Sequence, residues 1–208
     1  MTVLKVGIIG CGGIARGKHF PSLAQVKEVE MVAFCDIVVE RAEEAQEQYG
    51  TADSQVFSDY KEMLAAMDLD VVHVCTPNVS HAEISIAALE AGNHVMCEKP
   101  MAKTTAEARE MIEVAKRTGK KLTIGYQNRF ATESRYLQEV CAAGELGEIY
   151  SAKAHAIRRR AVPTWGVFLD EEAQGGGPLI DIGTHALDLT LWMMDNYKPK
   201  YVVGKTYH

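Results

Sequence analysis

The sequence predicts an α/β protein in which a doubly wound parallel sheet is followed by a second domain of α+β character. Three observations support this fold class: short apolar runs alternate with stretches of helical period, several of those stretches end at a glycine, and the alternation stops after Gly125. Strands that are apolar along their length are typical of parallel sheets covered on both faces. We therefore expect one domain over residues 1–125 and a second over residues 126–208.

The composition is that of a globular protein with one large or two small domains. The chain has 208 residues, of which 47% are hydrophobic and 24% charged, and its formal net charge is −6. Because the net charge is negative, we expect no dominant basic surface and therefore neither nucleic acid nor an anionic membrane as a partner. The N-terminal apolar run is too short to span a bilayer and lacks the flanks of a signal peptide. We expect a cytoplasmic protein with a small-molecule partner.

The cysteines argue against both a disulfide framework and a zinc site. They are five in number and form no C-x-x-C pair. Cys35, Cys75 and Cys97 each end an apolar run, so we expect reduced thiols that serve as small buried hydrophobes, and no metal.

The elements of the first domain follow from this alternation. Residues 3–9 form a β-branched run that stops at glycines, and Gly50 and Gly119 are positioned to end helices. Ser58 and Ser80 are positioned to begin helices, as is either Thr104 or Thr105. The expected strands cover residues 3–9, 30–36, 56–57, 70–75, 93–97 and 121–124, and the expected helices 13–25, 39–49, 58–67, 83–90 and 104–117.

The second domain shows fewer elements. We expect helices over residues 130–143 and 179–194, strands over 149–157 and 201–207, and an irregular loop over 158–174. Two strands make a thin sheet with open edges, so this open mixed sheet is expected to be incomplete in the present chain.

A glycine turn follows the first strand and opens the first helix. It reads Gly10-Cys11-Gly12-Gly13-Ile14-Ala15, a form of the dinucleotide-binding fingerprint of Rossmann domains. In that fingerprint Gly10 makes the turn, Gly12 lets the backbone approach a pyrophosphate, and Ala15 permits close packing of helix on strand. The amide groups at the helix N-terminus then face the phosphates.

Asp36 ends the second strand, where a carboxylate holds the ribose hydroxyls of a bound dinucleotide. A carboxylate there repels a 2′-phosphate, so the sequence favours NAD over NADP, although Arg41 lies close by. The alternative is that Asp36 caps a helix beginning at Ile37; both roles are compatible.

A charged pair, Glu98-Lys99, follows the fifth strand at the edge where open α/β sheets bind ligands. Pro100 restricts the backbone after Lys99, and a cis Lys99–Pro100 bond suits such a turn. A desolvated lysine there can hold an alkoxide or share its proton. A solvated surface pair is the alternative.

Asp181 and His185 are spaced i and i+4 on the last predicted helix, which places them on one face. This arrangement suits a base whose ring is oriented by a carboxylate, with Asp188 as a further support. The alternative is an aspartate that stabilises the helix dipole beside an incidental histidine.

Four ordered motifs together resemble the glucose-fructose oxidoreductase / inositol 2-dehydrogenase family, known as Gfo/Idh/MocA. They are the GCGGIA turn, Cys75-Thr76-Pro77-Asn78 with His81, Glu98-Lys99-Pro100, and the GGGPLIDIGTH stretch at residues 175–185. The resemblance spans almost the whole chain. It implies a two-domain, NAD-dependent oxidoreductase that transfers a hydride between a sugar, glycoside or cyclitol hydroxyl and nicotinamide, and a homo-oligomer formed through the second-domain sheet.

The resemblance also implies roles for individual residues. Lys99, Asp181 and His185 are the implied catalytic group, with His185 or Lys99 taking the hydroxyl proton. The implied cofactor contacts are Gly10, Gly12, Gly13, Ile14, Asp36, Ile37, Thr76, Pro77, Asn78, His81, Glu98, Lys99 and Gln127. The implied substrate contacts are Lys99, Asn128, Arg158, Trp165, Asp181 and His185.

The stretch RRRAVPTWGVF at residues 158–168 is similar to members that oxidise glycosides at the 3-hydroxyl. The Trp165 ring can stack on a sugar ring, and an arginine side chain can bind the sugar hydroxyls. The alternative is a solvated loop in which the tryptophan is packed.

Two other functions use a similar first domain. One is a non-catalytic NAD(P) sensor or assembly subunit. The other is an S-adenosylmethionine methyltransferase, in which neither the lysine triplet nor the Asp181/His185 helix has a role.

Overall fold

The computed structural model describes residues 3–157, 159–160 and 162–205. The chain divides into two compact units, one formed by residues 1–125 and 163–177 and the other by residues 126–162 and 178–208. Within the described ranges, no helix combines the length and the apolar character needed to cross a bilayer.

The first unit is built on six parallel strands in the order β3-β2-β1-β4-β5-β6, which confirms the predicted doubly wound sheet. The strands are β1 (Leu4–Ile9), β2 (Val29–Cys35), β3 (Gln55–Phe57), β4 (Val71–Val74), β5 (His94–Glu98) and β6 (Leu122–Gly125). The strand order reverses between β1 and β4, and ligands of such sheets bind at the carboxyl ends beside that reversal.

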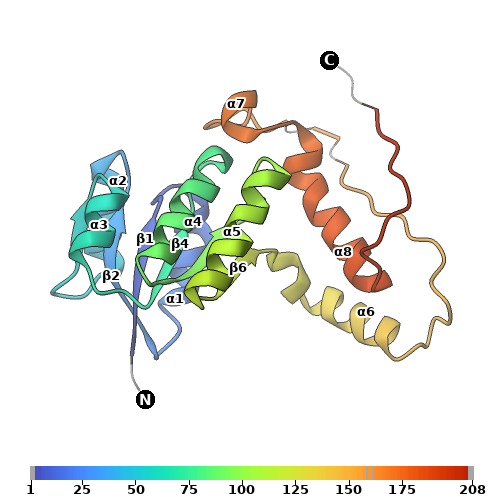
Figure 1. Ribbon diagram of the computed structural model, residues 1–208, viewed down its shortest axis with the longest axis horizontal. Helices are drawn as coiled ribbons and strands as arrows, with labels where there is room; N and C mark the ends of the chain where they lie inside the picture. The colour runs from blue at the N-terminus through green and yellow to red at the C-terminus, as the bar shows by residue number, and fades with distance from the viewer. Residues whose placement is uncertain (1–2, 158, 161, 206–208) are drawn as a thin grey trace. The chain divides into compact units, whose positions relative to one another are not determined.

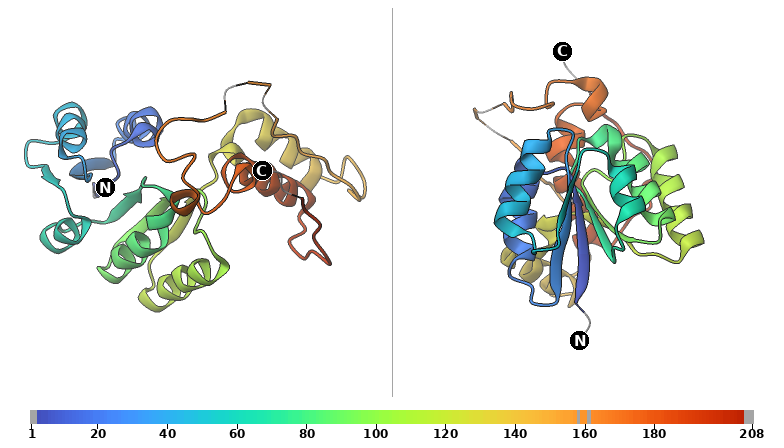
Figure 2. Two further views of the ribbon diagram at one scale, coloured as in Figure 1. Left: turned by 90° about the horizontal axis from the view of Figure 1, so that it is seen from above. Right: turned by 90° about the vertical axis from the view of Figure 1, so that its left-hand side faces the viewer.

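Helices cover both faces of this sheet (Figures 1 and 2). The chain supplies them in the order η1 (Ala15–His19), α1 (Phe20–Leu23), α2 (Val39–Tyr49), α3 (Tyr60–Ala66), η2 (Asn78–Ser80), α4 (His81–Glu90) and α5 (Thr105–Thr118). One core cluster packs Phe20 of α1 and Ala42 of α2 against Phe34 of β2. The other packs Met63 of α3 and Met111 of α5 against Val72 of β4. Apolar side chains on both faces explain why the strands show no alternation.

Helix ends follow the predicted signals in part. Thr104 and Glu107 form a complete capping box at the start of α5, and Gly119 ends it with φ +69°. Asp59, rather than the predicted Ser58, caps α3 by accepting a bond of 2.7 Å from the Lys61 amide. Ser80 makes no cap bond either, because its hydroxyl donates to the Thr76 hydroxyl and the Pro77 carbonyl.

The segment 163–177 packs with the first unit and contains one short helix, α7 (Glu171–Gln174), where the sequence predicted only a loop. Asp170 caps α7 through the Ala173 amide, and Gly175 ends it at φ +76°. Lys103 of the first unit donates a bond of 2.8 Å to the Glu172 carbonyl. The sequence signal is weak because the helix is only one turn long.

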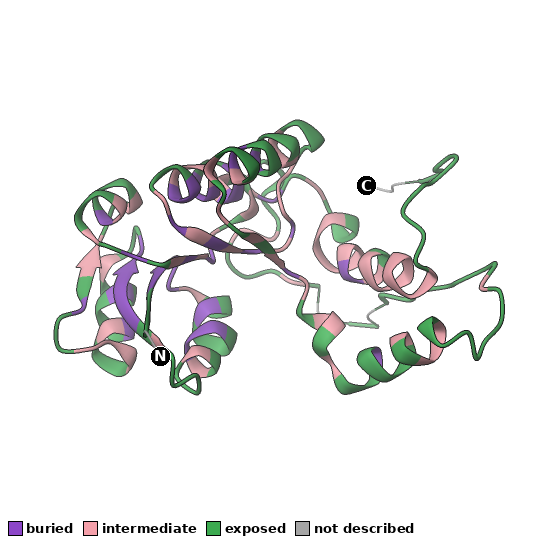
Figure 3. Cartoon of the chain, turned by 60° about the horizontal axis from the view of Figure 1, so that its bottom comes forward, coloured by how far each residue is buried: buried purple, intermediate pink, exposed green. Residues whose placement is uncertain are grey.

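The second unit is helical in its described part. It contains η3 (Gln127–Phe130), α6 (Thr132–Ala142), η4 (Leu179–Gly183) and α8 (Thr184–Met194). The predicted strands at 149–157 and 201–207 are wrong as far as they are described, because residues 149–157 and 201–205 form no strand. An extended segment becomes a strand only when a neighbouring segment pairs with it. No described segment pairs with residues 149–157 or 201–205. Much of α8 is only half-buried (Figure 3).

Candidate functional site

The glycine turn after β1 has the geometry that the fingerprint requires. Gly10 adopts φ +92°, and a Cβ there would lie 2.7 Å from the carbonyl carbon and oxygen of Cys75. A Cβ at Gly12 or Gly13 would meet no atom within 4 Å. The turn is therefore closed by β4 on one side and open at the start of η1, where first-turn amides lack intrahelical acceptors.

Asp36 is tied to this turn. Its Oδ2 accepts a bond of 2.8 Å from the Cys11 amide, and its Oδ1 accepts one of 2.9 Å from the Val38 amide. Asp36 is not the N-cap of α2, since Val38 occupies that position without a side-chain bond. The carboxylate is buried, whereas Ile37 beside it is 90% exposed.

These residues fit a bound dinucleotide. An open backbone cradle lies at a helix N-terminus, and a fixed carboxylate lies at the end of the neighbouring strand. Ile37 adds an uncovered apolar surface that a flat base would shield from water. Arg41 places a guanidinium nitrogen 4.0 Å from Oδ1 of Asp36.

The residues after β4 are held by internal contacts. His81 is only 1% exposed, and its ring nitrogens lie 2.8 Å from the Thr76 carbonyl oxygen and 2.7 Å from that of Pro100. Burial lowers the pKa of His81, although both carbonyl contacts favour its charged form. Its ring thus joins two backbone segments rather than presenting a surface to a ligand.

Asn78, predicted at the same edge, reaches the segment that carries α7. Its Nδ2 donates to both the side-chain oxygen and the carbonyl oxygen of Gln174, at 2.7 and 3.0 Å. Gln174 is buried in this contact and was missed by the sequence analysis, because a glutamine before a glycine run carries no signal of its own.

The turn after β5 contains Glu98, Lys99 and a cis Lys99–Pro100 bond, as expected. The Glu98 carboxylate is buried; its Oε1 lies 2.9 Å from Nε2 of His19, and its Oε2 accepts a bond of 3.1 Å from the Lys99 amide. Burial is the largest single influence on Glu98 and would raise its pKa, but the hydrogen bond and charge of His19, together with the amide and charge of Lys99, outweigh it, and the pKa is lowered. The alternative of a solvated surface pair is therefore wrong for Glu98, which is buried.

The second unit contains Asp181 in η4 and His185 in the first turn of α8. The π-helical turn of η4 interrupts the simple i, i+4 spacing that the sequence suggested. His185 is buried, with its ring edge-on to Tyr126 at a centroid distance of 6.1 Å, and the Tyr126 hydroxyl lies 2.8 Å from that of Thr184.

Asp188 does not support His185 as expected but pairs with Arg129, whose Nε donates at 2.8 Å. That hydrogen bond raises the pKa of the guanidinium. Gln127, Asn128 and Arg129 all lie in η3 of the second unit, so this pair joins η3 to α8.

Two predicted substrate contacts lie in the stretch before the glycine run. Trp165 is 60% exposed and packs edge-on against Phe168. Arg158 lies outside the described residues.

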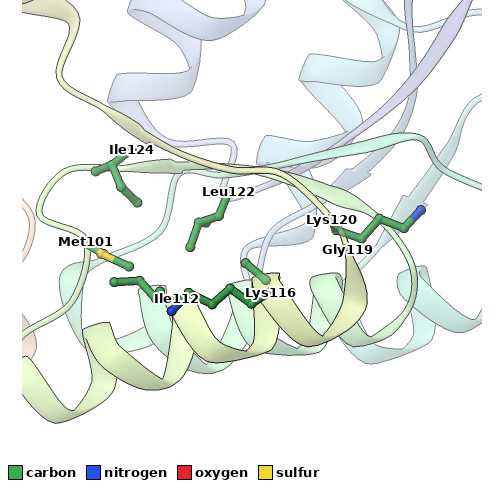
Figure 4. A pocket seen from close by; sticks show the side chains of 8 residues that line it. Met101, Ile112, Lys116, Gly119, Lys120, Leu122 and Ile124 are labelled. Atoms are coloured by element: carbon green, nitrogen blue, oxygen red, sulfur yellow. The ribbon is translucent and has the colours of Figure 1, made fainter.

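A shallow hollow of about 540 Å³ lies between α5 and β6, lined by apolar side chains and two lysines (Figure 4). It contains none of the predicted site residues. We therefore place the candidate site at the strand ends.

The thiols have the predicted character. All five cysteines are free, and Cys11, Cys35, Cys75 and Cys97 are buried. Burial raises the pKa of Cys11, Cys35 and Cys97 to about 12 each, so these thiols are poor nucleophiles. In the described part of the chain, no group of three or more His, Cys, Asp or Glu side chains is arranged to hold a metal.

Comparison with known proteins finds relatives that are named dehydrogenases. The chain is 47% identical over 191 residues to D-glucoside 3-dehydrogenase of Escherichia coli, covering 92% of this chain and 54% of that protein. It is 31% identical over 198 residues to inositol 2-dehydrogenase of Salmonella typhimurium, covering 94% and 56%. The chain thus spans about half the length of these relatives.

A solved structure has the same fold. The WlbA dehydrogenase from Bordetella pertussis, in complex with NADH and UDP-GlcNAcA, superposes with a TM-score of 0.82 at 25% identity, covering 92% of this chain and 55% of that one.

The family assignment rests on both parts of the chain. Residues 4–126 match the oxidoreductase family with an NAD-binding Rossmann fold, and residues 134–208 match the GFO/IDH/MocA C-terminal domain. With the glycine turn, Asp36 and the Glu98-Lys99-Pro100 turn at one sheet edge, the chain belongs to the Gfo/Idh/MocA family of NAD-binding oxidoreductases.

Proposed function

We propose that the complete polypeptide is an NAD-dependent dehydrogenase that oxidises a secondary hydroxyl of a sugar, glycoside or cyclitol. The observation that carries this proposal is the turn around Lys99, at the ligand-binding edge of the NAD-binding sheet. Glu98 holds the Lys99 amide on one side, and His81 contacts the Pro100 carbonyl on the other. A backbone fixed at both neighbours limits where the lysine amine can reach.

The cofactor residues are proposed in two groups. Gly10, Gly12, Gly13 and Ile14 face the phosphates, and Asp36 with Ile37 faces the adenosine end. For the nicotinamide end we propose contacts with Thr76, Pro77, Asn78, Lys99 and Gln127. We propose that His81 and Glu98 act behind this surface, because both are buried.

The chemistry needs a hydride acceptor and a proton acceptor. NAD, when bound, takes at nicotinamide C4 the hydride that leaves the carbinol carbon. Lys99 or His185 takes the hydroxyl proton, because a neutral amine and a neutral imidazole each offer a lone pair. Asp181 orients the side chain that accepts the proton or stabilises its protonated form. Asn128 binds substrate hydroxyls.

We propose a glycoside oxidised at its 3-hydroxyl as the substrate class to test first. The stretch at residues 158–168 and the 47% identity to a D-glucoside 3-dehydrogenase support this choice. Trp165 exposes its ring, as a platform for a sugar must, and Arg158 is proposed to bind a hydroxyl.

We also propose a cytoplasmic location, supported by five unpaired thiols, and a homo-oligomer. An oligomer through the second-domain sheet stays a prediction, because the described part of that unit holds no strand.

The test is NAD reduction by the full-length polypeptide with a panel of glucosides, aldoses and inositols. We expect turnover of at least one compound and a loss of at least about a hundredfold in kcat in Lys99→Ala. Equal rates for the variant would reject the role of Lys99. Tight NAD binding without turnover of any compound would instead favour the non-catalytic sensor.

A further inference from the structure

A chain of three polar side chains lies behind the turn that carries Lys99. His19 of η1 is buried between His73 of β4 and Glu98 of β5. Its Nδ1 lies 2.8 Å from Nδ1 of His73, and its Nε2 lies 2.9 Å from Oε1 of Glu98. The other carboxylate oxygen, Oε2, accepts the Lys99 amide at 3.1 Å.

One assignment of protons satisfies every contact in this chain with both rings neutral. His73 donates from Nδ1 to Nδ1 of His19, and His19 donates from Nε2 to Glu98. Burial is the largest cause that lowers the pKa of His73 to about 4, and a proton on the neighbouring His19 would lower it further, so the His73 ring is neutral at neutral pH. The two hydrogen bonds then run in the same direction, from His73 to His19 and from His19 to the Glu98 carboxylate.

Packing holds the carboxylate in this position. The rings of His19 and His73 meet edge to face, with centroids 5.1 Å apart. On the other side, a Cβ at Gly125 of β6 would lie 3.2 Å from the carboxyl carbon of Glu98. The absence of a side chain at Gly125 therefore leaves the space that Glu98 fills.

We propose that His19 is a positioning residue for Lys99, acting through the carboxylate of Glu98. The hydrogen bond from His19 fixes the ionised carboxylate, and the carboxylate fixes the backbone at Lys99. The role assigned to Lys99 rests on the proposed function, but the link from His19 to Glu98 does not. His19 itself need not touch either substrate or cofactor.

The charge of Glu98 depends on this link. Burial favours the neutral acid, and the bond from His19 is the largest opposing contribution to the lowered pKa of Glu98. The titratable groups that face or neighbour this carboxylate in the described structure are His19 on η1, His73 on β4, Cys75 after β4, His81 on α4, and Cys97 and Lys99 on its own strand and turn.

Two substitutions at one position separate the two contacts of His19. In His19→Gln the side-chain amide replaces Nε2 and keeps a donor toward Glu98. In His19→Asn it replaces Nδ1, keeps the contact with His73 and loses the donor to Glu98. Both variants lose the ring, so they serve as matched controls for packing and folding.

The first measurement is the titration of the Glu98 carboxyl carbon by ¹³C NMR in the full-length polypeptide, assigned by its loss in Glu98→Gln. We expect the carboxyl to titrate at higher pH in His19→Asn than in the wild type or in His19→Gln. An unchanged Glu98 titration in His19→Asn would overturn the proposal.

The second measurement is the pH profile of kcat/KM. In His19→Asn we expect kcat/KM to fall about tenfold for each pH unit below the raised pKa of Glu98, while His19→Gln keeps the wild-type profile. An equal drop at all pH values in both variants would indicate a structural role only and overturn the proposal. If the wild-type polypeptide turns over no substrate, the proposed function fails, and the NMR titration of Glu98 still decides this inference.

Discussion

The backbone amide of Cys11, within the glycine turn, donates a hydrogen bond of 2.8 Å to the carboxylate of Asp36 at the end of β2. The acid that is proposed to hold a ribose thus also fixes the loop that is proposed to hold the pyrophosphate. The two halves of the cofactor site are therefore one unit, and a change at Asp36 should affect both.

Replacing Asp36 with serine should weaken NAD binding by about tenfold or more, because a hydrogen bond to a charged group contributes about 1.5–3 kcal/mol. The affinity for NADP should fall less than that for NAD, because the substitution removes the negative charge that repels a 2′-phosphate and Arg41 stays close. Calorimetric titration with both cofactors measures the ratio. Asp70→Ser is the control, because Asp70 makes a similar bond to the Lys5 amide at the opposite edge of the sheet. An unchanged NAD to NADP ratio in Asp36→Ser would contradict this assignment.

Alanine at two glycines of the turn should have different effects. Gly10→Ala should destabilise the protein by about 1–3 kcal/mol, since φ is +92° and the new Cβ would meet the Cys75 backbone at 2.7 Å. Gly12→Ala should leave the melting temperature nearly unchanged, because a Cβ there meets no protein atom within 4 Å. It should nevertheless weaken NAD binding, since that space is proposed to receive the pyrophosphate. Thermal unfolding with and without NAD measures both effects, and equal NAD affinity in Gly12→Ala and wild type would argue against the placement.

The sequence predicted the cofactor half of this fold because its signals are local. A glycine turn, an acid at a strand end and Thr104 three residues before Glu107 can each be recognised within a few positions. Contacts between distant segments could not be recognised in the same way. His19 meets Glu98 only because η1 crosses toward β5 when the sheet is assembled.

The second unit shows a second limit of prediction from sequence, which concerns its strands. Residues 149–157 have the composition of a strand, but a strand exists only through hydrogen bonds to a neighbour, and sequence pattern does not say whether that neighbour is present. The helices α6 and α8 were predicted within a few residues, because a helix makes its own backbone bonds.

The contact between Asn78 and Gln174 should hold α7 against the first unit. Asn78→Ala removes two hydrogen bonds, at 2.7 and 3.0 Å, and should lower the protection of the Gly175 amide by about tenfold, which corresponds to about 1.4 kcal/mol. Hydrogen exchange measured by mass spectrometry over residues 170–177 gives this value. Ser80→Ala is the control, because among the described residues the Ser80 hydroxyl bonds to Thr76 and Pro77 and not to the segment that carries α7. Equal exchange in both variants would show that this contact does not hold the helix.

The pair of Arg129 and Asp188 should stabilise the second unit. Asp188→Asn should lower the free energy of unfolding by about 1–3 kcal/mol, because it weakens a two-point ion pair whose guanidinium also lies 5.3 Å from the ring centre of Trp192. Chemical denaturation followed by tryptophan fluorescence measures the change. Asp195→Asn, at an exposed helix end where φ is +46° and asparagine is tolerated, should be nearly neutral. Similar losses in both variants would contradict a specific role for the pair.

His73 should make the stability of the first unit depend on pH. Its pKa is lowered from 6.5 to about 4 in the folded protein, so between these values the unfolded chain binds a proton that the native state does not. Stability from this group is complete above about pH 6.5 and is lost as the pH falls toward 4, by an amount on the order of 3 kcal/mol. In His73→Asn, which keeps an amide at the Nδ1 position but does not titrate, the free energy of unfolding should change less over this range. Denaturation curves at several pH values, with the exposed His155→Asn as control, measure the slope. A slope in His73→Asn equal to that of the wild type would mean that folding does not lower the pKa of His73, and the pH dependence would then have to come from other groups.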